Sequence, residues 1–127
     1  MQLNDVKIVG NLTREPELVH TPKGTPIANV SLGVNENYST EGERKTVTSF
    51  VDVRVWGAAA ENLSKLAKKG QELFIEGSLR QEQWNDKETG KSRSKLFINA
   101  NNWQFTQYKM TEASRAAAQS RGPEVGR

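Results

Sequence analysis

The sequence of 127 residues has no cysteine, a single histidine and no long apolar run. Without cysteine, disulfides, thiolate zinc sites and cysteine nucleophiles are excluded. His20 cannot form a multi-histidine metal site, and it stands beside a turn without an organised acidic partner. We therefore expect no enzyme, no catalytic residue, no metal and no cofactor. No segment is long enough to span a membrane, and the first ten residues lack the features of a secretory signal, so we expect a cytoplasmic protein.

The charge balance permits a polyanionic partner without requiring one. The chain has 18 Lys and Arg against 15 Asp and Glu, for a formal net charge of +3, which is ordinary for a small domain. Its hydrophobic content is only 35% and it has ten glycines, a combination that favours an all-β domain with a small core.

Hydrophobic periodicity divides the chain into five predicted strands and one helix. Apolar and polar residues alternate with a period of two in segments 5–12, 28–34, 46–56, 72–84 and 93–105. Between the third and fourth segments the period changes to that of a helix, over residues 58–69. One helix between strands three and four of a five-stranded chain is the layout of an OB-fold barrel.

Polar segments connect these elements and end the chain. Residues 35–45 are polar and are predicted to form a flexible loop, and residues 85–92 are predicted to form a hairpin loop. From residue 111 the sequence turns to small and polar residues that cannot bury much apolar surface. We therefore expect an OB-fold domain over residues 1–110 and a flexible tail over residues 111–127.

Large aromatic residues stand where the pattern assigns them to solvent. Phe50 and Trp56 alternate with valines that are predicted to point inward, Trp84 shares its parity with charged residues, and Tyr38 lies in the polar segment 35–45. Burial of such a side chain would stabilise a fold by about 1.5–3 kcal/mol, which exposure forgoes. A nucleobase stacked on an exposed ring contributes about 1–3 kcal/mol, whichever base it is. These rings are therefore candidate stacking sites for single-stranded nucleic acid.

Packing beneath a loop or in a subunit interface is the alternative interpretation for each ring taken alone. We favour that alternative for the remaining aromatic residues of the barrel, Phe74, Phe97, Trp103 and Phe105.

Basic residues accompany the candidate stacking rings and could contact phosphates. The candidates are Arg54, Lys69, Arg80, Lys91, Arg93 and Lys95. Most of them share the outward parity of their strands. The acidic residues Asp52, Glu76 and Glu82 share the same faces, so they would weaken a positive groove.

Several segments, in this order and at close spacing, resemble bacterial single-stranded DNA-binding proteins. They are residues 9–12 (VGNL), 15–18 (EPEL), 21–24 (TPKG), 28–32 (ANVSL), 55–57 (VWG), 68–70 (KKG), 74–80 (FIEGSLR) and Trp84. The resemblance covers about residues 3–105. It implies an OB-fold that binds and protects single-stranded DNA, independently of sequence, in DNA replication, recombination and repair. It also implies a homotetramer, commonly assembled by pairing of first strands into dimers that stack.

Matching the motifs of that family identifies the same site residues. Its stacking aromatics correspond to Tyr38, Phe50, Trp56 and Trp84, and two of its basic positions correspond to Lys69 and Arg80. The family often has basic residues where this chain has Asp52, Ala58, Glu82 and Gln83, a difference that bears on affinity and wrapping mode rather than on fold.

The end of the chain also departs from that family. The family typically ends in an acidic, hydrophobic tip that recruits replication and repair enzymes, whereas residues 111–127 carry a net charge of +1. We therefore do not expect recruitment by that route. Three interpretations stay open: a phage- or plasmid-encoded member, an otherwise divergent member, or a shortened chain. The short tail and the acidic residues on the faces support an alternative, an OB-fold adaptor for replication restart or protein interaction that binds DNA weakly.

Overall fold

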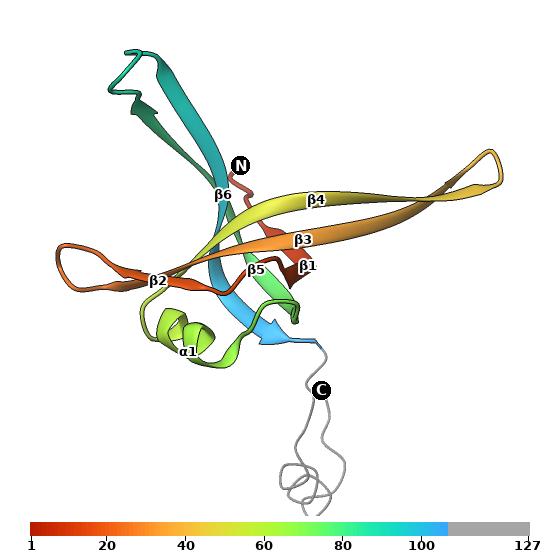
Figure 1. Ribbon diagram of the computed structural model, residues 1–127, viewed down its shortest axis with the longest axis horizontal. Coiled ribbons are helices and arrows are strands. Elements are labelled where there is room, and N and C mark those ends of the chain that lie inside the picture. Colours follow the sequence, from red (N-terminus) through yellow and green to blue (C-terminus); the bar gives the residue numbers. More distant parts are fainter. Residues whose placement is uncertain (107–127) are drawn as a thin grey trace, which may run out of the picture.

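The computed structural model describes residues 1–106 of the chain (Figure 1). The predicted tail over residues 111–127, and the last four residues of the predicted domain 1–110, lie outside the described residues. The elements are β1 (Val6–Leu12), β2 (Glu17–His20), β3 (Pro26–Thr40), β4 (Glu43–Trp56), α1 (Ala58–Leu66), β5 (Glu72–Asn85) and β6 (Ser92–Phe105). No helix among these residues is long and apolar enough to cross a membrane.

Five of the strands close into a barrel. The hydrogen-bonded order is β1-β5-β6-β4-β3, and β1 returns to β3 through the pairs Asn11–Gly33 and Leu12–Leu32. The short strand β2, which the periodicity did not predict, adds to the free edge of β3 outside this ring. The single helix lies between the third and fourth strands of the barrel, so the predicted OB-fold is confirmed.

Close crossings of the backbone explain two glycines of the barrel. A Cβ on Gly10 would lie 2.9 Å from the carbonyl oxygen of Gly33, where β1 leaves β5 and crosses to β3. A Cβ on Gly77 would lie 2.8 Å from the Cα of Ala100, where the register of β5 and β6 shifts. Only glycine fits such approaches, so these residues permit the strands to curl into a closed barrel.

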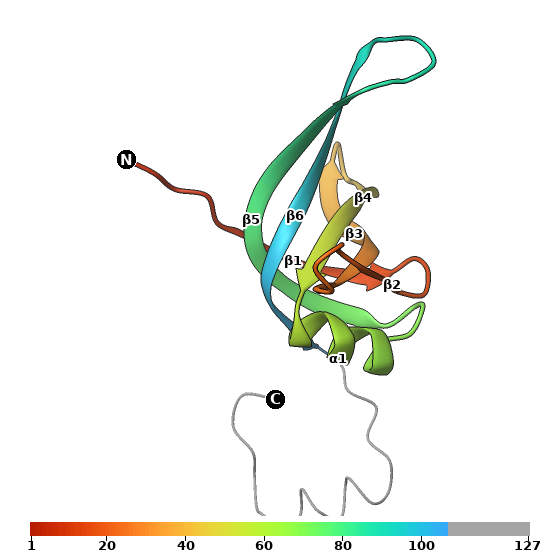
Figure 2. The same ribbon diagram turned by 90° about the vertical axis from the view of Figure 1, so that its left-hand side faces the viewer.

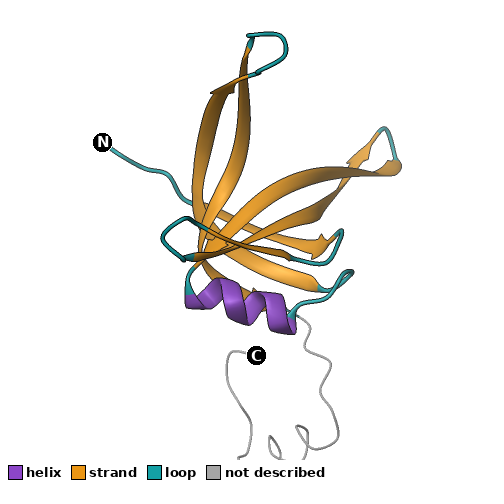
Figure 3. Ribbon diagram, turned by 60° about the vertical axis from the view of Figure 1, so that its left-hand side comes forward, coloured by secondary structure: helices purple, strands orange, loops and turns teal. Residues whose placement is uncertain are grey.

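The core is aliphatic and lies inside the barrel, next to the helix. The alternation predicted for the third strand is confirmed, since Val53 and Val55 are buried on the inner face. Helix α1 closes one end of the barrel (Figures 2 and 3) and packs Ala60 and Leu63 into the core. It ends at Leu66, which is exposed, rather than at residue 69 as predicted, because the chain becomes extended at the following residue.

Two long hairpins extend from the other end of the barrel as separate arms (Figures 1 and 3). We call the β3–β4 hairpin arm A and the β5–β6 hairpin arm B. The prediction of a flexible loop over residues 35–45 was wrong, because β3 continues to Thr40 and β4 begins at Glu43. Glu41 and Gly42 both have positive φ, as a two-residue hairpin turn of type I′ requires. Side-chain hydrogen bonds such as the one from Thr46 to Asn37 (2.8 Å) cross the arm.

The alternation of β6 reverses along its length. Phe97, Ile98 and Ala100 are buried, whereas Leu96 is 59% exposed although it shares the parity of Ile98 and Ala100. Beyond the register shift opposite Gly77, Trp103 and Phe105 pack against the core and meet edge to face with their ring centroids 5.3 Å apart. An extra residue in β6 moves the inward positions to the opposite parity, which explains why Trp103 and Phe105 face the core.

Candidate nucleic-acid interface

The predicted stacking rings are exposed, as expected from the pattern. Phe50 is 74% exposed, Tyr38 and Trp84 are each 46% exposed and Trp56 is 43% exposed. The buried core, in contrast, contains no aromatic residue other than Phe97 among residues 1–106. The fold therefore places its large rings at the surface of the arms and their bases, although their role as stacking sites stays a prediction.

Phe50 and Trp56 lie on one face of β4, separated by six residues. At strand rise this is about 20 Å, the spacing of two separate stacking positions. Gly33 stands directly opposite Phe50 on β3, and a Cβ there would lie 3.7 Å from the Phe50 ring. Because the position opposite the ring has no side chain, one side of Phe50 stays open.

The other two rings lie elsewhere. Tyr38 stands opposite Lys45 across arm A. Lys45 is five residues from Phe50 along β4, so Tyr38 and Phe50 alternate to opposite faces of the arm. Trp84 lies on arm B, directly opposite Arg93. The structure thus brings Phe50 and Trp56 to one face, and places Tyr38 and Trp84 on separate surfaces that a long, flexible ligand could reach in succession.

Three of the six predicted phosphate-contacting residues are engaged in ion pairs. The Arg54 guanidinium donates a hydrogen bond to the Glu82 carboxylate at 2.7 Å and lies over the Phe97 ring at 4.0 Å from its centroid. The Arg54 hydrogen bond lowers the pKa of Glu82. The other two pairs are Lys95 with Asp52 at 3.4 Å and Arg93 with Asp86 at 3.3 Å.

The other three predicted residues are available. Lys69, Arg80 and Lys91 are exposed and form no ion pair within the part of the chain that the structure describes. Lys69 follows α1, where its backbone N–H donates a hydrogen bond to the Glu15 carboxylate at 3.3 Å. Arg80 and Lys91 lie on β5 and in the loop of arm B, so the available cations are spread along the molecule rather than gathered in one place.

A charged depression lies between the two rings of β4. Arg54 of β4 pairs with Asn29 of β3, and Asn29 pairs in turn with Glu17 of β2. Asp52 lies on the same face of β4, between Arg54 and Phe50. Its lining residues include Arg14, Glu17, Asn29, Asp52, Arg54 and Lys95.

Two of the basic residues beside the rings were not among the predicted contacts. Arg14 lines the charged depression from the loop after β1, and Arg44 lines a second depression with Tyr38 near the tip of arm A. Periodicity could not identify Arg14, because it follows the end of a strand and only the folded barrel brings it beside β4.

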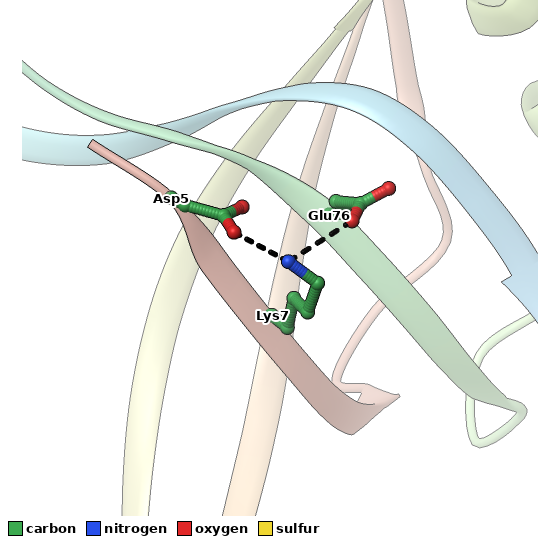
Figure 4. A network of polar contacts seen from close by, with 3 residues as sticks. All are labelled: Asp5, Lys7 and Glu76. Atoms are coloured by element: carbon green, nitrogen blue, oxygen red, sulfur yellow. Dashed lines mark hydrogen bonds and ion pairs between the residues drawn. The ribbon is translucent and has the colours of Figure 1, made fainter. Parts of the chain in front are cut away.

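On the far side of the barrel, the basic residue of β1 is also neutralised (Figure 4). Lys7 lies between the carboxylates of Asp5 and Glu76, and its Nζ is 3.2 Å from the latter. The hydrogen bond to Asp5, followed by the one to Glu76, raises the pKa of Lys7. No group of three or more potential metal-ligating side chains occurs within residues 1–106.

Comparison with known proteins identifies relatives over almost the whole barrel. Residues 3–106 match the model of the single-strand binding protein family. A single-stranded DNA-binding protein of Deinococcus radiodurans is 39% identical over 93 residues, which are 72% of this chain and 31% of that protein. A protein of the same name from Helicobacter hepaticus is 37% identical over 103 residues, which are 80% of this chain and 60% of that protein.

A solved structure with the same fold is a deletion mutant of the single-stranded DNA-binding protein from Thermus aquaticus. It superimposes with a TM-score of 0.73 at 31% sequence identity, and the match covers 83% of this chain and 51% of that one. The chain described here thus spans between about a third and three fifths of the lengths of these relatives.

Proposed function

The chain belongs to the single-strand binding protein family, and from that premise we propose that it binds single-stranded DNA without base specificity and without catalysis. The observation that carries this proposal is the exposure of four large aromatic rings, 43–74%, on a barrel whose buried core is almost entirely aliphatic. Relatives that are 37–39% identical are named single-stranded DNA-binding proteins, which supports the same ligand.

The proposed mechanism combines stacking with phosphate contacts. Bases lie flat on Tyr38, Phe50, Trp56 and Trp84. Every base has a π-face, so this contact is independent of sequence. The phosphates between them contact basic side chains and release counterions, which makes the affinity depend on salt concentration. The proposed phosphate contacts are Arg54, Lys69, Arg80, Lys91, Arg93 and Lys95.

The direct test removes two rings and measures binding to a labelled oligo(dT) of about 35 nucleotides, a length of several OB-fold footprints. At about 1–3 kcal/mol per ring, each truncation of Trp56→Ala and Trp84→Ala weakens binding by about 5- to 150-fold. Fluorescence anisotropy of the oligonucleotide gives the affinity, and thermal melting confirms that the variant is folded.

Leu66→Ala is the matched control, because Leu66 is a large apolar residue that is 58% exposed on α1, away from the arms. The control is expected to bind as the native chain does. Equal affinity of the folded double variant and the native chain would contradict stacking.

We further propose that the protein is a homotetramer. In the described structure, β1 pairs with β5 along residues 6–11 but with β3 only at residues 11–12. The other edge of β1 over residues 6–10 is therefore open to pair with a second copy. The molecular mass in solution, with and without oligo(dT), tests this, and a monomeric mass in both states would contradict it.

In the cell, we propose that the protein coats and protects unwound strands during DNA replication, recombination and repair in the bacterial cytoplasm. A second candidate function is that of an adaptor that meets other replication or repair proteins and binds DNA weakly. The ion pairs of Arg54, Arg93 and Lys95 favour it, because they neutralise half of the proposed phosphate contacts. Comparison of the affinity for oligo(dT) with the affinity for a replicative helicase distinguishes the two.

A further inference from the structure

In the free protein, positive and negative side chains balance at the charged depression between Phe50 and Trp56. Three cations belong to it, from three separate elements: Arg14 from the loop after β1, Arg54 from β4 and Lys95 from β6. Three carboxylates offset them, because Glu17 and Asp52 line the same depression and Glu82 reaches Arg54 from β5. A surface that lies between two stacking rings would be expected to attract phosphates, yet here its positive charge is cancelled.

The carboxylates contact the cations directly. Glu82 accepts a hydrogen bond from Arg54 at 2.7 Å, and Asp52 lies 3.4 Å from the ammonium group of Lys95. A carboxylate and a phosphate present similar acceptor oxygens to a guanidinium or an ammonium group, so each carboxylate occupies the place that a phosphate would take. Arg54 is also stacked over Phe97, which holds the guanidinium in position whichever anion it contacts.

Both carboxylates can be displaced. The side chains of Glu82 and Asp52 are each 41% exposed, so either can move into water when its cation contacts another anion. Exposed pairs of this kind are weak, which makes exchange feasible, although each pair still reduces what the cation contributes to binding.

We propose that Asp52 and Glu82 occupy Arg54 and Lys95 in the free protein as internal competitors of DNA phosphates, and that these two acidic residues set the affinity for single-stranded DNA. This inference rests on the proposed function. Phosphates between bases stacked on Phe50 and Trp56 replace the two carboxylates. Arg14 forms no ion pair within the described residues, so a phosphate can contact it without displacing a carboxylate.

The test neutralises the competitors with Asp52→Asn and Glu82→Gln in one chain and measures oligo(dT) binding across a range of salt concentrations. Release of two exposed pairs is expected to tighten binding by about 2- to 30-fold. Arg54 and Lys95 contact phosphates in both complexes, so the number of neutralised phosphates, and with it the slope of log affinity against log salt, is expected to stay unchanged.

A matched control separates this effect from a general change in charge. Glu61→Gln with Glu88→Gln removes the same charge from α1 and from the loop of arm B, and neither residue forms an ion pair in the described structure. An equal gain in affinity in both double variants would overturn the inference while leaving the proposed function in place. Failure of the native chain to bind would overturn the proposed function itself.

A second comparison remains informative if the neutralised chain is less stable. Arg54→Gln is expected to weaken binding more in the background of Asp52→Asn and Glu82→Gln than in the native chain, because in the native chain the phosphate contact of Arg54 is partly offset by the loss of its pair with Glu82. Equal weakening in both backgrounds would mean that Arg54 already contacts phosphate in the native complex without competition, and would overturn the inference.

Discussion

Truncation of Phe50 separates binding from folding, because Phe50 is the most exposed of the four proposed stacking rings. Phe50 is 74% exposed, so only about a quarter of its surface is buried against the barrel. Full burial of such a side chain is worth about 1.5–3 kcal/mol, so Phe50→Ala should cost roughly 0.5 kcal/mol of the free energy of unfolding. The loss of a stacked base should instead cost about 1–3 kcal/mol of binding free energy, or about 5- to 150-fold in affinity.

The assay uses the tryptophans that this variant retains. Titration of native protein and Phe50→Ala with oligo(dT) gives two affinities from intrinsic fluorescence, and urea denaturation gives the two free energies of unfolding. Unchanged affinity would refute the assignment of Phe50 as a stacking ring. A loss of stability larger than the loss of binding free energy would show instead that its main role is structural.

Three further changes test the barrel, the ion pairs and the charged depression. Gly77→Ala places a Cβ 2.8 Å from the Cα of Ala100 and is expected to destabilise the fold by about 1–3 kcal/mol, measured by urea denaturation. Arg54 lowers the pKa of Glu82, so the stability from this pair is present above the ordinary pKa of 4.5 and is lost as pH falls through the lower folded value. The melting temperatures of the native chain and Glu82→Gln should therefore converge on acidification, and a constant difference would contradict this. Arg14→Gln should weaken oligo(dT) binding and reduce its salt slope by about 0.7.

The sequence predicts the barrel because alternation and burial agree along most strands. Val53 and Val55 occupy inward positions, and the outward residues Phe50 and Trp56 are exposed, as the period of two requires. The period of two does not give the inward positions correctly where an irregularity in strand pairing interrupts it. The register shift near Gly77 changes the parity of β6, and no residue type in β6 marks that position.

Arm A shows a second limit of the sequence. Residues 35–45 are polar because both faces of this hairpin meet water, so their hydrophobicity resembles that of a loop. The sequence did contain a signal for this hairpin. It is the two-residue turn at Glu41 and Gly42, flanked by strand-forming threonines and Val47.

The pairing within the candidate site could not be obtained from sequence alone. The parity of Asp52 and Glu82 indicates that they share a face with basic residues. Their partners, however, lie 28 and 43 positions away in the chain, on other strands. Only closure of the barrel decides that Glu82 meets Arg54 and that Asp52 meets Lys95.

Titration of the native chain with poly(dT) at low salt, followed by tryptophan fluorescence, tests most directly whether unpaired bases stack on the exposed rings. Trp56 and Trp84 are 43% and 46% exposed, and stacking should quench their emission strongly, with recovery as salt is added. Emission that stays unchanged while the chain is shown by sedimentation to bind the polymer would contradict the account.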